Sequence, residues 1–172
     1  MALGEYQIQG FWTQEFLRDA LEKGLIDFER FASACSTLAI SNYFYLSLTP
    51  EIILEILRKD GYQLSGRVDA MLNILAGLDT IEDEAIRISS KLLRQLWFDP
   101  VVEEQRLLIL DRLLVYLTNN RIMDRVLFKL RKLLAVELIV APLQDINIRN
   151  AIISWRKLHP STNSLVMGRR TD

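Results

Sequence analysis

The sequence has very little of the residues on which many enzymes depend. Its 172 residues include one cysteine, Cys35, and one histidine, His159. Zinc sites are built from three or four such ligands, so zinc binding by the usual ligand sets is excluded. A Ser–His or Cys–His nucleophile would depend on this one imidazole. A single cysteine also excludes an internal disulfide and fits a reducing compartment, so we expect the cytoplasm.

Glycine and proline are also scarce, with seven and four residues. A chain so poor in turn-forming residues has little room for a loop-rich β architecture, and its glycines form no phosphate-binding loop motif. No stretch is apolar over the ~20 residues that a membrane span requires. The first residues, MALGEYQIQG, lack the basic start and apolar segment of a signal peptide. We therefore expect neither a membrane location nor secretion.

What the sequence does contain is typical of a folded domain, since 50% of it is hydrophobic and 25% is charged. The net charge is −1, but the charges are unevenly distributed. Residues 1–118 contain 11 Lys or Arg and 18 Asp or Glu, whereas residues 119–172 contain 10 and 4. We expect an acidic helical region at 1–118, basic C-terminal helices at 119–158 packed on it, and a tail at 159–172.

Apolar residues recur every three or four positions through almost the whole sequence, which is the pattern of amphipathic helices. Helix starts are predicted at Thr13, Asp27, Thr49-Pro50, about Ser65, the TIED segment at 80–83 and Asp99-Pro100, with further helices at roughly 121–139 and 146–158. The short links between them indicate an all-α fold, either a multi-helix bundle or a short α-solenoid of about eight helices. The aromatic YFYLSL segment at 43–48 indicates either one short strand or an extended connector.

Carboxylates are the remaining route to catalysis, because Mg²⁺- or Mn²⁺-dependent nucleases gather three or four acids around the metal. The acids here are scattered, and many stand at expected helix starts, where the helix dipole favours negative charge. Glu55 is the candidate catalytic acid, but it stands four residues before Lys59, the spacing of an ordinary ion pair. We therefore expect Glu55 to be the solvated partner of Lys59 or Arg58, with no metal site and no cofactor.

Basic residues of the C-terminal region form a second candidate site. Arg121, Arg125 and Lys129 are spaced by four on one face of the expected seventh helix, and Lys132 follows them. Such a row can neutralise the phosphates of RNA or DNA, so these four residues are the candidate nucleic-acid contacts. It can equally pair with the acidic N-terminal half or form the solvated face of the helix.

Three tryptophans, Trp12, Trp97 and Trp155, are expected to anchor the core or an interface. A helical chain with so few reactive groups often presents a leftover hydrophobic face to another protein or domain. Contact with another protein or domain is therefore the partner prediction that the composition favours, with RNA as an alternative.

The segments FLRDALEKGLIDFERFASACSTL, YFYLSLTPEIILEIL, AIRISSKLLRQLW and EEQRLLILDRLL follow one another within about residues 11–118. Their helix boundaries and apolar positions resemble the helical C-terminal part of certain large bacterial PIN-domain-like proteins. PIN domains are metal-dependent ribonucleases with a parallel α/β fold. The resemblance therefore implies either a helical region associated with a PIN domain or a Mg²⁺- or Mn²⁺-dependent ribonuclease.

The catalytic motifs of that family are absent, both the "D-x-N" or "D-x-S" after a first strand and the later "TxD". Glu55, in LTPEIILEIL, is the one residue that matches a segment supplying an acid, and one carboxylate cannot build a metal site. Our leading hypothesis is a non-catalytic, cytoplasmic helical interaction domain. The alternatives are a PIN-like metal-dependent ribonuclease or nuclease subunit, and a nucleic-acid-binding helical module.

Overall fold

The computed structural model describes residues 3–43, 46–76 and 80–160, including the side chains of all but residues 3–12 and 76. The described residues form eight helices and no strand, which confirms the all-α prediction. The helices are α1 (Leu3–Glu22), α2 (Phe28–Ile40), α3 (Pro50–Lys59), α4 (Gly66–Ala76), α5 (Glu82–Phe98), α6 (Glu103–Thr118), α7 (Met123–Glu137) and α8 (Pro142–Leu158).

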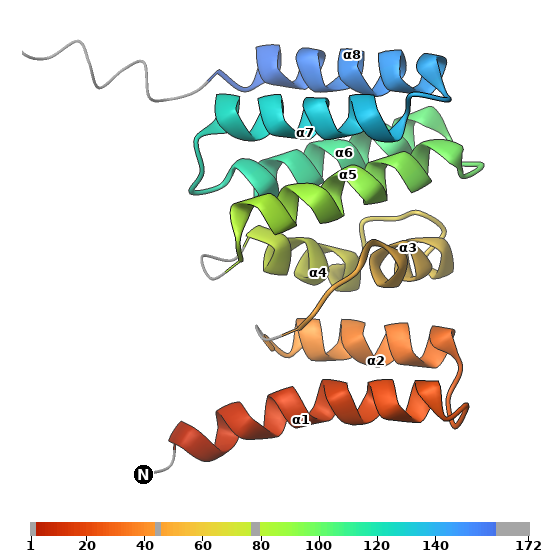
Figure 1. The fold of residues 1–172 in the computed structure, drawn as a ribbon, viewed down its shortest axis with the longest axis vertical. Helices are drawn as coiled ribbons and strands as arrows, with labels where there is room; N and C mark the ends of the chain where they lie inside the picture. Colours follow the sequence, from red (N-terminus) through yellow and green to blue (C-terminus); the bar gives the residue numbers. More distant parts are fainter. Residues whose placement is uncertain (1–2, 44–45, 77–79, 161–172) are drawn as a thin grey trace, which may run out of the picture.

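The helices are stacked approximately in chain order, with α1 at one end and α8 at the other (Figure 1). Their main contacts join helices that are adjacent in the chain or separated by one helix, such as α2 with α4, α3 with α5 and α5 with α7. Packing between near neighbours along a stack is the arrangement of a short α-solenoid. Each end of the stack therefore has a helix with one face turned away from the body of the protein.

Two predicted helix starts are caps in the structure. The Asp27 carboxylate accepts a hydrogen bond from the backbone N–H of Arg30 at 2.8 Å. The Thr49 hydroxyl accepts one from the backbone N–H of Ile52 at 3.5 Å, and Pro50 is the first residue of α3. Both caps satisfy a donor that the first helical turn leaves without a partner, and both were predictable because cap and donor are three residues apart.

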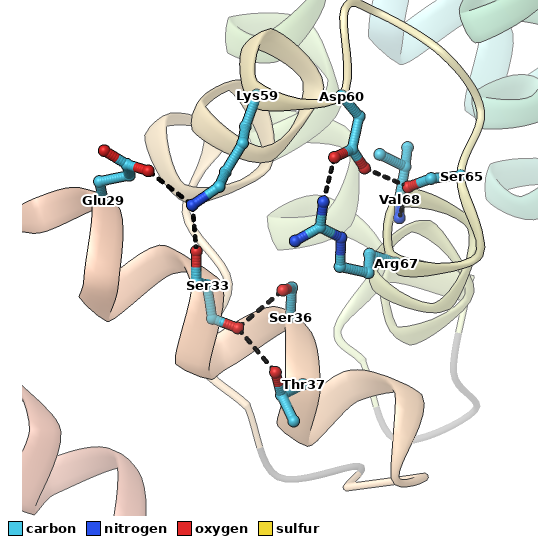
Figure 2. A network of polar contacts seen from close by, with 9 residues as sticks. All are labelled: Glu29, Ser33, Ser36, Thr37, Lys59, Asp60, Ser65, Arg67 and Val68. Carbon is cyan, nitrogen blue, oxygen red and sulfur yellow. Dashed lines mark hydrogen bonds and ion pairs between the residues drawn. The ribbon is translucent and has the colours of Figure 1, made fainter.

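The start of α4 combines a cap with a longer-range contact. The Ser65 hydroxyl accepts a hydrogen bond from the backbone N–H of Val68 at 3.3 Å and donates one to the carboxylate of Asp60 (Figure 2). Arg67 binds the other oxygen of Asp60 (Figure 2). This network closes the turn between α3 and α4 and agrees with the predicted helix start at about Ser65.

The predicted helix start at Thr13 is wrong, whereas the TIED segment at 80–83 contains the start of α5 at Glu82 but does not form the predicted cap. Thr13 lies inside α1, which begins well before it. Thr80 does not cap α5, because its hydroxyl donates to the carbonyl of Ile74 at 3.0 Å. The residue in the cap position of α5 is Ile81, whose side chain forms no capping hydrogen bond. The Thr80 hydroxyl therefore binds a carbonyl of α4 and does not cap α5.

The short strand considered for residues 43–48 is not found in the described part of that segment, and Phe44 and Tyr45 lie outside the described residues. Residues 46–48 form an irregular connector held by the side chain of Gln14 on α1. The Ser47 N–H donates to Gln14 Oε1 at 2.9 Å, and Gln14 Nε2 donates to the Ser47 carbonyl at 3.1 Å. A buried side-chain amide thus satisfies both backbone groups of one residue, as a neighbouring strand would.

The hydrophobic core runs along the stack and is formed mainly by α3 to α6. Its largest fully buried side chains are Ile53, Ile56, Leu57, Met71, Leu72, Ile86, Leu92, Leu93, Leu96, Ile109, Leu110 and Leu113. These are apolar positions of the helical periodicity, so the inward face of each central helix follows from the sequence pattern.

Replacing Thr49 with alanine should lower the free energy of unfolding by about 1 kcal/mol, because the N–H of Ile52 loses its acceptor. The measurement is urea-induced unfolding followed by circular dichroism. Thr49→Ser keeps the hydroxyl and should lose much less stability. Equal losses for the alanine and serine variants would contradict the capping role.

Candidate functional site

Glu55 is half-buried on α3, beside a concavity of about 640 Å³ between α3 and α5. The partners predicted for it bind other residues. Lys59 Nζ lies 2.5 Å from Glu29 Oε1 and donates to the Ser33 hydroxyl at 3.2 Å, both on α2 (Figure 2). Arg58 binds Asp99. The predicted pairing of Glu55 with Lys59 or Arg58 is therefore wrong, because acids on neighbouring elements compete for both cations.

Asp99 is the centre of a network that joins α3 to the end of α5. Arg58 donates to its two carboxylate oxygens, each at 3.0 Å, and the Tyr62 hydroxyl donates to Oδ2 at 2.6 Å. The hydrogen bonds from Arg58 hold the pKa of Asp99 below its usual value, although partial burial opposes them. Asp99 follows α5 and does not start α6, so the predicted helix start at Asp99 is wrong.

The carboxylates beside Glu55 do not form a recognisable metal site. Within the described ranges, no group of three or more His, Cys, Asp or Glu could hold a metal ion. Glu51 and Asp99 line the same concavity as Glu55, but Arg58 and Arg94 line it too. Glu55 therefore shares this surface with two carboxylates and two guanidinium groups, so charges of both signs lie beside it.

Cys35 is unsuited to nucleophilic chemistry. Its thiol is buried on α2, and burial raises its pKa to about 11. The thiolate, which is the reactive form, is therefore almost absent near neutral pH.

Millimolar Mg²⁺ or Mn²⁺ should leave the melting temperature of the protein unchanged. A cation raises the melting temperature when it binds the folded state preferentially, which requires grouped ligands. The measurement is thermal denaturation with each metal and with a chelator. A rise that disappears in Glu55→Gln would contradict this expectation and identify a metal site at that carboxylate.

The predicted basic row is divided between different environments. Arg121 precedes α7 and donates hydrogen bonds to the backbone carbonyls of Leu117 at 3.2 Å, Leu75 at 3.2 Å and Thr80 at 3.3 Å. Partial burial lowers the pKa of Arg121. Its guanidinium therefore joins the ends of α4 and α6 to the segment before α5.

Arg125 and Lys129 lie on α7 and bind the acidic start of α5. Both contact Glu82, Lys129 at 2.9 Å, and Lys129 also lies 2.6 Å from Asp83. The hydrogen bond from Lys129 helps to hold the pKa of Glu82 below its usual value. Lys132 is exposed and has no ion pair with a described residue. Three of the four candidate nucleic-acid contacts thus bind groups of their own chain, and nucleic-acid binding stays a prediction.

A second concavity, of about 690 Å³, lies between α8 and the α5–α6 pair. We call it the α8 groove. Its lining includes Trp97, Arg106 and Asp111 on one side and Asn147, Asn150 and Ser154 on α8. Two of the three tryptophans expected to anchor a core or an interface, Trp97 and Trp155, line it, while the side chain of Trp12 lies outside the described residues.

The aromatic walls of the α8 groove are held by polar contacts. The Trp155 indole N–H donates to Asp111 Oδ1 at 2.8 Å, and its ring stacks on His159 with centroids 4.3 Å apart. The Arg106 guanidinium lies 6.0 Å from the centre of the Trp97 ring and donates to the Asp99 carbonyl at 2.7 Å. Fixed aromatic and polar groups of this kind suit ligand recognition because little order is lost on binding.

The outer face of α8 carries an apolar stripe, formed by Leu143, Ile146 and Ile153, which are 72%, 52% and 37% exposed. Their spacing of three and seven places them on one side of the helix, whereas Ile148 and Ile152 are buried on the other. The turn before α8 adds two exposed residues, Ile139 and Val140. Because α8 is at the end of the stack (Figure 1), no described helix covers this stripe.

Sequence reasoning missed both the groove and the stripe. The signal for the stripe was present, because α8 has apolar residues at two sets of helical spacing and a single inward face accounts for only one. The groove had no comparable signal, since its two walls come from segments about forty residues apart, as Asp111 and Trp155 show.

The fold and these surfaces define an all-α protein of the short solenoid type with two candidate contact surfaces at its C-terminal end. Comparison with family models, curated proteins and solved structures gave no match. The resemblance to the helical part of PIN-domain-like proteins therefore stays a prediction. Over the ranges that the structure describes, no helix has the length and apolar character needed to cross a membrane.

Proposed function

We propose that this chain is a non-catalytic helical interaction domain that binds another protein through the apolar stripe of α8. The observation that carries the proposal is the exposure of Leu143, Ile146 and Ile153 on the outermost helix. The last helix of an isolated solenoid needs a polar outer face to remain soluble. Exposed apolar residues along one side of the outermost helix are typical of a surface that a partner covers.

The charges of the chain support this proposal. The acidic start of α5 and the basic face of α7 bind each other through Glu82, Asp83, Arg125 and Lys129. Contact with a partner at this place would have to compete with ion pairs already made. The stripe has no such competition, and full burial of each aliphatic side chain contributes about 1.5–3 kcal/mol relative to exposure.

The chemistry of the described residues supports a role without catalysis. The Cys35 thiol is buried, and the Asp99 carboxylate is bound by Arg58 and Tyr62. A cytoplasmic location remains part of the proposal, because a single cysteine suits a reducing compartment.

The proposal can be tested by photo-crosslinking in the cells that naturally produce the protein. A photoreactive residue at Ile146 should give a discrete adduct, whereas one at Asn73, an exposed position on α4, should give none. Ile153→Glu should reduce the Ile146 adduct about tenfold, because a charge would be buried in the contact. Its melting temperature should remain close to that of the wild type.

The mass of the adduct distinguishes a second copy of this chain from a different protein. Equal adducts from positions 146 and 73, or no adduct from position 146, would contradict the proposal.

A further inference from the structure

We infer that the α8 groove binds an extended segment of a partner protein, through its backbone and through one lysine or arginine side chain. The inference rests on the proposed function and adds a second contact surface together with the chemistry of its ligand. It depends on three observations: an amide contact elsewhere in the chain, a row of polar side chains on α8, and two carboxylates in the groove.

The chain already contains the contact that this binding would use. Gln14 on α1 accepts from the Ser47 N–H at 2.9 Å and donates to the Ser47 carbonyl at 3.1 Å. The two groups belong to one residue of a non-helical connector. A side-chain amide on a helix can therefore form two hydrogen bonds with one residue of a non-helical backbone, one to its N–H and one to its carbonyl. It can do so because an amide carries a donor and an acceptor side by side.

Asn147 and Asn150 present the same chemistry to the α8 groove. Both are exposed, line the groove, and have no hydrogen bond from their amides to a described residue. With Ser154 they form a row about 10 Å long, given the helical rise of ~1.5 Å per residue. That length corresponds to about three residues of extended chain. The row can therefore bind the backbone of a segment that lies along α8.

The charges in the groove favour a basic side chain on this segment. Glu103 and Asp111 line the groove, and neither forms an ion pair with a described Lys or Arg. Asp111 Oδ1 lies 3.8 Å from His159 Nε2, and that imidazole is charged only when it is protonated. Arg106 also lines the groove, with its guanidinium over Trp97, and His159 stacks on Trp155, so the rings already have partners. Two carboxylates against one arginine still leave an excess of negative charge, which favours pairing with a lysine or arginine of the segment. The same carboxylates would repel the phosphates of RNA.

The test starts from a display library of random dodecapeptides selected against the purified full-length chain. Selected peptides should share a lysine or arginine, and fluorescence polarisation then measures the binding of one labelled peptide. Asn147→Ala combined with Asn150→Ala should weaken binding about tenfold, because two amide contacts are lost. Asn73→Ala, an exposed asparagine on α4, is the matched control and should change nothing.

Asp111→Asn separates charge from structure. It keeps the Oδ1 atom that accepts from the Trp155 N–H, so the wall of the groove is retained. This substitution should weaken binding of the labelled peptide about tenfold. It should also remove the preference of the groove for arginine over norleucine at the basic position of the peptide. N-methylation along the peptide should weaken binding at the residues that face Asn147 and Asn150.

Thermal denaturation verifies that each variant is folded. Peptides that bind equally well to the groove variants, or an N-methyl scan without effect, would overturn the inference, as would failure to enrich any peptide. Asn150 lies one turn from Ile146, so the crosslinking at Ile146 is measured in the chain with Asn147 and Asn150 unchanged, where none of these results would alter the adduct. Failure of the groove is thus distinguishable from failure of the proposed function.

Discussion

Replacing Leu93 with alanine should lower the free energy of unfolding by about 2–5 kcal/mol. Leu93 is fully buried on α5, the helix that contacts α3, α6, α7 and α8. Alanine would remove three carbon atoms from the centre of the stack and leave a cavity that rigid neighbours on both sides cannot fill. Urea-induced unfolding measured by circular dichroism gives the change directly.

A matched variant at the end of the stack tests the solenoid architecture. Ile152 is also buried, but it lies on α8, which has neighbours on one side only. Because contacts run between near neighbours, Ile152→Ala should open α8 locally, and amide exchange should accelerate there while α3 to α5 stay protected. Leu93→Ala should accelerate exchange throughout the stack. A loss below about 1 kcal/mol for Leu93→Ala would contradict its burial.

Asp99→Ala is expected to cost about 2–3 kcal/mol near neutral pH, because the carboxylate accepts charge-assisted hydrogen bonds from Arg58 and a further bond from Tyr62. This loss of stability is smaller than the sum of three such hydrogen bonds, because Arg58 is half exposed and water can replace part of its contact with Asp99. Tyr62→Phe removes one donor and should cost less than Asp99→Ala. A loss below about 0.5 kcal/mol is typical of substitutions at exposed sites. Such a small loss for Asp99→Ala would contradict the network.

The contribution of Asp99 should also depend on pH. Its pKa is lower in the folded protein than in the unfolded chain, so the folded state favours the carboxylate form. The stabilisation is fully present above the unfolded pKa of about 3.9 and is lost as pH falls through the lower folded pKa. The difference in unfolding free energy between the wild type and Asp99→Asn should therefore be constant above about pH 5 and shrink below about pH 4. A difference that already shrinks near neutrality would indicate another titrating group.

Local signals in the sequence predicted the helices well where each signal and its partner are close in the chain. Asp27 and Thr49 cap backbone donors three residues away, and both caps are present in the structure. Asp99 has the same local appearance as a helix start, but its partner Arg58 is 41 residues away. A contact at that distance has no counterpart in a local pattern.

The candidate site shows the same limit. The spacing of Arg125 and Lys129 correctly predicted that they share a helix, and left open whether phosphates or the acidic half of the chain would bind them. Packing of α7 on α5 brings Glu82 against both cations although it is 43 and 47 residues away. Glu55 does not pair with its predicted partners for the same reason, because acids on other elements bind Lys59 and Arg58.

The sequence by itself determined that this protein is helical, that its inward faces are apolar, and that it lacks the ligands for zinc and the cysteines for a disulfide. Helices and their faces depend on hydrogen bonds and spacings within a few residues, so a linear sequence contains them. Only the tertiary structure decided which charges pair, which polar side chains meet across the α8 groove, and that the stripe of α8 is left uncovered. Those outcomes depend on distances between helices, which exist only once the stack has formed.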